Sequence, residues 1–172
     1  MSEQQISRDD AVKNVRLMAR RTALLYYYFA KTLVDELGEE EGKRLTAKAV
    51  WAYGEHCGKA VREGVQAMGL PPTDENFNKV TDLPSVGWDM SRVTLENGDE
   101  HPIATYCPLA AVWKELGAED IGRMYCMVDQ AKYHGYNPDY EYIHAKNVLD
   151  GDEYCEFVVK LKSEDSELKG QG

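Results

Sequence analysis

The sequence has no long hydrophobic run and no close pair of cysteines. The longest apolar stretch, TALLYYYFA at residues 22–30, is far too short to cross a bilayer, which takes about 20 apolar residues. The opening residues, MSEQQISRDD, lack the basic and apolar segments of an export signal. These absences predict a soluble cytoplasmic protein of bacterial type that does not contact a membrane. In that compartment the four cysteines are expected to be thiols.

Familiar cofactor and metal motifs are also missing. The successive cysteines are separated by 49, 18 and 28 residues, whereas structural zinc ligands usually come in close pairs such as CxxC. There is no GxGxxG, no Walker loop, no HExxH and no GxSxG. The sequence therefore predicts no cofactor, and a metal remains a less favoured alternative.

Positive charge is scarce in the second part of the chain. Residues 71–172 carry 9 basic and 20 acidic side chains, while the whole chain has a net charge of −10. Phosphate backbones repel such a segment, so nucleic acid is not an expected partner. A small molecule is the partner that the sequence favours.

Helical periodicity dominates the first 70 residues. Apolar positions recur at helical spacing over residues 9–37, where Gly38 ends the pattern. A second helix is expected over residues 39–68, closed by Gly69. The tight joint at Gly38 predicts that the two helices form an antiparallel hairpin.

The rest of the chain mixes strands with shorter helices. The dipeptide Asn97–Gly98 is a strong hairpin signal and separates two candidate strands, residues 88–95 and 101–106. Helices are expected over residues 108–116 and 119–134, and a second hairpin over residues 140–148 and 154–161, joined at Asp150–Gly151.

The predicted fold class is α+β, in which an N-terminal antiparallel helical hairpin precedes an antiparallel sheet of two hairpins with two intervening helices. Residues 1–162 form a single domain, with the helical hairpin in residues 1–70 and the site-bearing sheet and helices in residues 71–162. Residues 163–172 are predicted to be a disordered tail.

Cys107 is the first candidate site residue. It directly precedes Pro108, and proline is favoured at the first position of a helix, so Cys107 is expected at the N-cap. Free amides and the helix dipole stabilise an anion there, which predicts a lowered thiol pKa. Such a thiol is suited to act as a nucleophile or a metal ligand.

The helix expected over residues 119–134 carries a second group of candidates. Cys126 and Asp129 are three residues apart and share a face, with Tyr125 and Lys132 nearby and His134 at the helix end. Cys126 is interpreted more readily as a small core residue. For Asp129 a functional role is favoured, because a carboxylate on the apolar side of a helix needs a partner.

The last hairpin adds further polar residues. Alternation places Cys155 on the buried face of its strand, which favours a structural thiol. Asp150 and Asp152 fit turn chemistry. His144 is interpreted either as a general base or as an ordinary surface or core residue of its strand.

Three runs resemble the C-terminal half of the L-2-amino-thiazoline-4-carboxylic acid hydrolase family. They are CPLAAVWKELG, IGRMYCMVDQAKYHGYNP and GDEYCEF. The helical half, with EEEGKRL and WAYGEHCGKAVREG, is compatible with that family. The closing GDEYCEF also resembles the hairpin of small-molecule-binding domains of the vinyl-reductase type.

The resemblance implies a hydrolase that opens a thiazoline ring to an N-carbamoyl-cysteine-type product. Either Cys107 attacks the isothiourea carbon, or Asp129 activates water directly while the cysteines shape the pocket. In the first route Asp129 pairs with the amidinium of the substrate. The catalytic candidates are Cys107, Asp129, Cys126, His134 and His144. The candidates for substrate binding are Tyr125, Lys132, Asn137 and Arg123, with Arg20 and Arg21 as further cations for the substrate carboxylate.

Other functions stay open at this point. A non-enzymatic small-molecule-binding or sensory domain would use the same pocket without turnover, and a thiol- or metal-based redox role would use the cysteines differently. The N-terminal helices either cover the sheet or pair across a homodimer.

Overall fold

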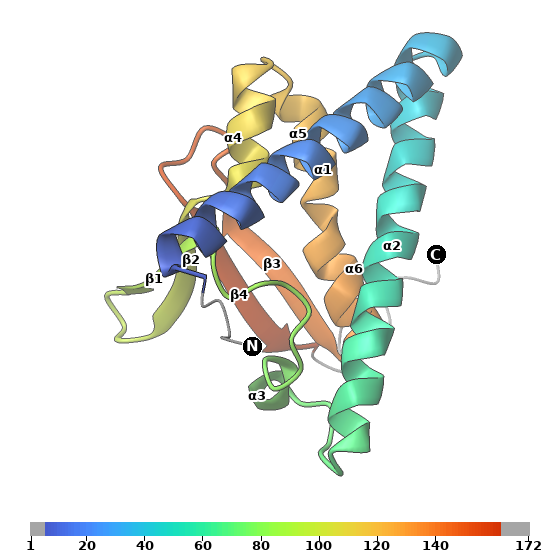
Figure 1. Ribbon diagram of the computed structural model, residues 1–172. Coiled ribbons are helices and arrows are strands. Elements are labelled where there is room, and N and C mark those ends of the chain that lie inside the picture. Colours follow the sequence, from blue (N-terminus) through green and yellow to red (C-terminus); the bar gives the residue numbers. More distant parts are fainter. Residues whose placement is uncertain (1–5, 163–172) are drawn as a thin grey trace, which may run out of the picture.

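The computed structural model describes residues 6–162, and the tail predicted over residues 163–172 lies outside the described residues. The chain folds as α+β, which confirms the predicted class (Figure 1). The elements in chain order are α1 (Arg8–Leu37), α2 (Glu39–Ala67), α3 (Asp74–Phe77), β1 (Asp89–Thr94), β2 (Glu100–Tyr106), α4 (Pro108–Glu115), α5 (Glu119–Tyr125), α6 (Met127–Tyr136), β3 (Tyr140–Lys146) and β4 (Cys155–Leu161). Within residues 6–162, none of the helices has the length and apolar character needed to cross a membrane.

The two long helices form the hairpin expected from the sequence. Ser7 caps α1 by accepting a hydrogen bond from the Asp10 amide at 3.1 Å. Gly38 alone joins α1 to α2 and has a φ of 84°, a conformation that glycine adopts without strain. Figure 1 shows α1 and α2 diverging from this joint like the arms of a V.

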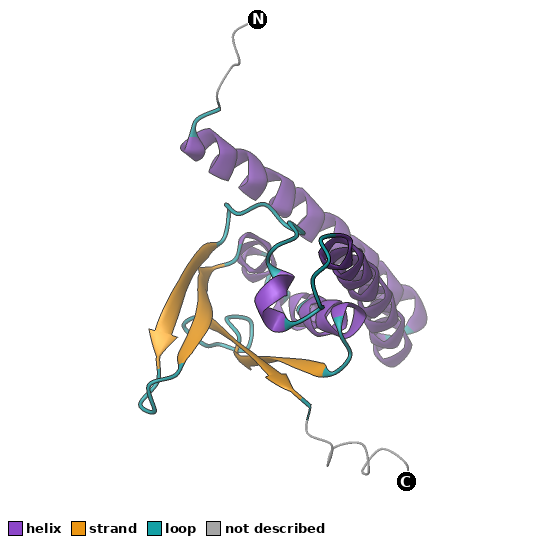
Figure 2. Cartoon of the chain, turned by 90° about the horizontal axis from the view of Figure 1, so that it is seen from below, coloured by secondary structure: helices purple, strands orange, loops and turns teal. Residues whose placement is uncertain are grey.

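The strands form one antiparallel sheet in the order β1-β2-β4-β3. The two sequence hairpins, β1–β2 and β3–β4, are joined at the centre of the sheet, where Ile103 pairs with Glu156 and Ala104 with Cys155. The helices lie on one side of this sheet (Figure 2). The second hairpin has a longer connection than predicted, because β3 ends at Lys146 and the chain turns at the buried Asn147.

The prediction of one continuous helix over residues 119–134 is wrong. The chain breaks at Cys126, which separates α5 from α6. The break is a tightened turn, because the Cys126 amide donates to the Arg123 carbonyl at 3.2 Å and the Asp129 amide to the Cys126 carbonyl at 3.3 Å. These bonds span three residues in place of the four of an α-helix.

Glycines allow α2 and α6 to approach each other backbone to backbone. A Cβ atom added at Gly58 would lie 1.9 Å from the Lys132 carbonyl oxygen, and one at Gly54 would lie 2.6 Å from the Cβ of Ala131. In the opposite direction, a Cβ at Gly135 would lie 2.4 Å from the Glu55 carbonyl oxygen. No side chain fits at these positions, so the glycines fix the distance between the two helices.

Replacing Gly58 is expected to disrupt this contact. We predict that Gly58→Ala lowers the free energy of unfolding by about 2–3 kcal/mol or more, since the new methyl group overlaps backbone atoms that cannot move away. Gly64→Ala in the same helix is the matched control. Its Cβ meets only the end of the Val80 side chain, and alanine adds about 1 kcal/mol of helix propensity. Urea unfolding would measure both variants, and equal stability of the two would contradict the packing argument.

Candidate active site

Asp129, in the first turn of α6, faces strand β3. One of its carboxylate oxygens lies 3.2 Å from Nε2 of His144. The His144 side chain is only 2 % exposed, whereas that of Asp129 remains 34 % exposed. The aspartate is therefore anchored by a buried imidazole while part of its carboxylate stays accessible to a ligand or to water.

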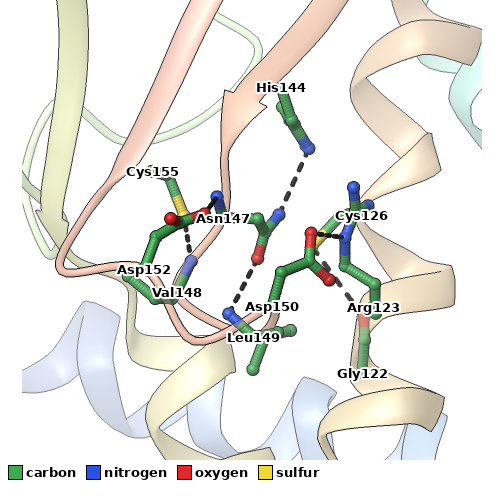
Figure 3. A network of polar contacts seen from close by, with 10 residues as sticks. All are labelled: Gly122, Arg123, Cys126, His144, Asn147, Val148, Leu149, Asp150, Asp152 and Cys155. Atoms are coloured by element: carbon green, nitrogen blue, oxygen red, sulfur yellow. Dashed lines mark hydrogen bonds and ion pairs between the residues drawn. The ribbon is translucent and has the colours of Figure 1, made fainter.

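A chain of hydrogen bonds fixes which nitrogen of His144 carries the proton (Figure 3). The Leu149 amide donates to Oδ1 of Asn147 at 2.9 Å, which orients the Asn147 amide group. Its Nδ2, a donor, then lies 3.3 Å from Nδ1 of His144. Nδ1 must therefore accept, so the proton is on Nε2 and is donated to Asp129.

The loop that carries Asn147 is itself held in place. Asp152 accepts a hydrogen bond from the main-chain amide of Asn147 at 2.8 Å, and Asp150 forms an ion pair with Arg123 at 2.8 Å (Figure 3). Cys155 is buried and its sulfur accepts from the Val148 amide at 3.5 Å. The predicted burial of Cys155 is confirmed, and so is the turn chemistry of Asp152, whose carboxylate positions Asn147. The side chain of Asp150 pairs with Arg123 instead.

The thiols of the site are not activated. Cys107 occupies the predicted N-cap of α4, but burial raises its pKa and outweighs the hydrogen bonds from the Ala110 and Leu109 amides. The predicted lowering of this pKa is wrong, because the cost of removing a thiolate from water exceeds the stabilisation that the helix N-terminus gives it. Burial, reinforced by the negative charge of Asp129, raises the pKa of Cys126 to about 12.

Lys132 brings a buried positive charge to the same face of α6 as Asp129. Its side chain is 10 % exposed, and its ammonium pairs with Asp82 of the loop before β1 at 2.6 Å. Burial alone would lower the pKa of Lys132, but the carboxylates of Asp129 and Asp82 outweigh it and the pKa is raised. Lys132 is therefore charged at neutral pH.

Aromatic side chains surround these charges. Tyr125 packs edge-on against Tyr26, with ring centroids 4.9 Å apart, and burial raises the pKa of its hydroxyl. From β3, Tyr142 packs against His144 at 5.5 Å, and burial raises its pKa as well. Tyr53 reaches the cluster from α2, where burial and the nearby Cys57 thiol raise its pKa. These phenols stay neutral and act as hydrogen-bond donors or apolar walls.

Several predicted site residues make other contacts. His134 pairs with Glu55 of α2 at 2.8 Å, so it faces α2 and not β3. Asn137 donates to the Pro72 carbonyl at 3.0 Å, and its amide closes the C-terminus of α6. Arg123 holds the loop through Asp150, and Arg20 pairs with Glu115 at 2.6 Å. Among the described residues, no group of three or more His, Cys, Asp or Glu is placed to hold a metal ion.

The structure thus brings together Asp129, His144, Lys132, Tyr125 and the thiols of Cys107 and Cys126. Asn147 and Asp82 belong to this cluster as well, although neither was predicted from the sequence. The signal for Asn147 was its place between a strand and the turn LDGD, where a polar residue is often buried to satisfy backbone amides.

The pKa values of the thiols give a direct test. We predict that alkylation of Cys107 and Cys126 by iodoacetamide accelerates steadily as the pH rises from 6 to 9, since burial raises the pKa of both thiols above that of an ordinary cysteine. At pH 8, a thiol with a pKa of about 12 holds on the order of 10³-fold less thiolate than an ordinary cysteine. Peptide mapping of the native protein gives the rates, with Cys57 as the internal control. A rate for Cys107 that is already maximal at pH 7 would show a thiolate and contradict this assignment.

Comparison with known proteins identifies the family to which the chain belongs. A model of the family described as L-2-amino-thiazoline-4-carboxylic acid hydrolase matches residues 18–159. The match runs from within α1 almost to the end of β4 and includes every residue of the site described above. No curated protein and no solved structure matches the chain. The family match spans most of the chain, and the protein belongs to the L-2-amino-thiazoline-4-carboxylic acid hydrolase family.

Proposed function

We propose that the protein is a hydrolase that opens a small thiazoline- or amidine-type ring bearing a carboxylate, with L-2-amino-thiazoline-4-carboxylate as the representative substrate. The product is of the N-carbamoyl-cysteine type. Family membership supports this proposal. The observation that carries it is the placement of two opposite charges, Asp129 and Lys132, on one face of α6 beside the buried His144.

Such a substrate has opposite charges at its two ends, and so does this face of α6. The isothiourea carbon bears a sulfur and two nitrogens, and its protonated form is a cation. Asp129 is suited to meet that cation, and Lys132 is suited to bind the carboxylate. Side chains three residues apart on a helix have their Cβ atoms about 5–6 Å apart, comparable to the length of a substituted five-membered ring. Asp82, which now pairs with Lys132, would give way to the substrate carboxylate.

The hydrogen bonds favour a route in which water attacks directly. His144 donates from Nε2 to one oxygen of Asp129, which leaves the other oxygen to accept a proton from water. The water oxygen bonds to the isothiourea carbon, and the ring carbon–sulfur bond then breaks. The departing sulfur takes up the proton held by Asp129, and the extra proton of the cationic substrate is released to solvent from the new urea oxygen. One water is therefore consumed and no other reactant is needed.

The raised pKa values of the thiols support the same route. A covalent mechanism needs a thiolate at Cys107, and burial disfavours that thiolate. In this proposal Cys107 and Cys126 shape the pocket as small neutral side chains. The Asn147–His144 contact keeps Asp129 in position and does not itself touch the substrate.

Turnover of L-2-amino-thiazoline-4-carboxylate tests the proposal. Mass spectrometry detects ring opening directly, because the product is heavier by one water. We predict that Asp129→Asn lowers kcat by about 10²–10⁴-fold, since the amide retains the hydrogen bond from His144 but cannot take a proton. Lys132→Met is expected to act mainly on KM, whereas Cys107→Ser keeps most of the activity. Lys48→Met, at an exposed position of α2, is the control.

Two results would overturn parts of this proposal. Loss of turnover in Cys107→Ser with retention in Asp129→Asn would replace the water route by a covalent one. Tight binding of the substrate by the wild type without any product, measured by calorimetry alongside the mass spectra, would reject the hydrolase and leave a binding or sensory domain.

A further inference from the structure

The two sides of α1 differ in an unexpected way. Its fully buried residues are small, Ala19, Ala23 and Ala30, which are 8 %, 0 % and 1 % exposed, while Leu24, Tyr26 and Tyr27 are partly buried against the core. Five other large apolar residues lie on the outside of the helix and are between 57 % and 66 % exposed. They are Leu17, Met18, Leu25, Tyr28 and Phe29, and we name them the α1 stripe.

The α1 stripe forms one surface. Met18, Leu25 and Phe29 recur at intervals of seven and four residues, and Tyr28 follows Leu17 by eleven, which are spacings of a single helical face. α1 packs against α2, α4 and α5 with its other side. In Figure 1, α1 crosses in front of α4 and α5. The high exposure of the stripe residues places them on the side of α1 that faces solvent. A contiguous apolar surface of this kind usually marks an interaction site.

We infer that the α1 stripe is covered by a second copy of this chain, whose α1 packs antiparallel to the first about a two-fold axis near Tyr28 and Phe29. A two-fold contact uses the same surface on both partners, so that surface must be complementary to itself. The inference is independent of the reaction proposed above.

The exposed area is of the size that a dimer requires. Five large side chains, each more than half exposed, present on the order of 100 Å² apiece, or about 500 Å² together. With the axis near Tyr28 and Phe29, these two residues and Leu25 would face the partner's α1, whereas Leu17 and Met18 would face the region of its α1–α2 joint. A stable interface buries about 800 Å² on each partner, of which the outer part is polar. Exposed polar residues supply such contacts, Arg21 and Thr22 between the apolar residues of the stripe and Thr32 and Glu36 beyond its C-terminal end.

Charge favours an antiparallel arrangement of two copies. Arg21 lies toward the N-terminal end of the stripe and Glu36 beyond its C-terminal end, and within residues 6–162 neither forms an ion pair. An antiparallel pairing centred near residues 28 and 29 brings Arg21 of each copy opposite Glu36 of the other. A parallel pairing would place like charges together, which is unfavourable.

The stripe also continues into an apolar groove. A cavity of about 230 Å³ opens between α1 and α2, and Phe29, Leu33 and Tyr53 are among the residues that line it. Because Phe29 belongs both to the stripe and to the groove, a second copy seated on the stripe would also cover the mouth of this groove.

Sedimentation equilibrium of the full chain tests the inference. The wild type is expected to have twice the mass of the 19.5 kDa chain at micromolar concentration. The double substitution Leu25→Glu with Phe29→Glu should leave a monomer whose circular dichroism is unchanged, since both positions are exposed. Leu161→Glu, at an equally exposed apolar position on β4, is the control and should remain dimeric.

Charge reversal gives the second test. Arg21→Glu and Glu36→Arg should each raise the dimer Kd about tenfold, and the combined variant should restore it, because the pair is re-formed with its signs exchanged. A wild type that is monomeric at 100 μM would overturn the inference and assign the stripe to a different protein. A dimer that survives the two glutamates, or charge variants that do not compensate, would also overturn it.

Discussion

The structure depends on the close contact between α2 and α6. Gly54 and Gly58 on one helix and Gly135 on the other let the two backbones meet, so that α6 is fixed against α2. The opposite side of α6 faces β3, where Asp129 meets His144. A wider helix spacing would shift Asp129 and Lys132 relative to the sheet and to the loop that carries Asp82. The polar cluster is therefore a consequence of backbone packing between helices that are distant in sequence.

Desolvation determines which groups of the cluster are chemically useful. It keeps Cys107 and Cys126 protonated although one lies at a helix N-terminus. Asp129, by contrast, keeps access to solvent and receives a hydrogen bond from His144. Lys132 tolerates burial because two carboxylates face it. The same physical effect therefore disfavours the thiolates and leaves two oppositely charged side chains on one face of α6.

Local signals predicted the fold well. Gly38 ended α1, Asn97–Gly98 placed the first hairpin, and Pro108 placed Cys107 at the N-cap of α4. The break at Cys126 could not be predicted, because the apolar periodicity continues across it and only tertiary packing tightens the turn. The placement of four strands in the order β1-β2-β4-β3 likewise depends on contacts between hairpins.

The site was predicted only in part for the same reason. Spacing along α6 linked Asp129 with Lys132, since neighbours on a helix can be read from sequence. Their partners His144, Asn147 and Asp82 come from a strand and two loops, and no spacing rule connects these to α6. His134 was expected in the site because it closes the same helix, but it points toward α2 and pairs with Glu55.

We propose that the reactive group is the Asp129 carboxylate, held by a neutral His144, and not a thiolate. This is tested by the ¹⁵N spectrum of the histidine side chains in the uniformly labelled protein at neutral pH, with His144 assigned by comparison with His144→Gln. We expect a neutral His144 ring that is protonated at Nε2 and unprotonated at Nδ1, because the side-chain amide of Asn147 donates to Nδ1. A proton on Nδ1, in either the neutral or the charged ring, would contradict it.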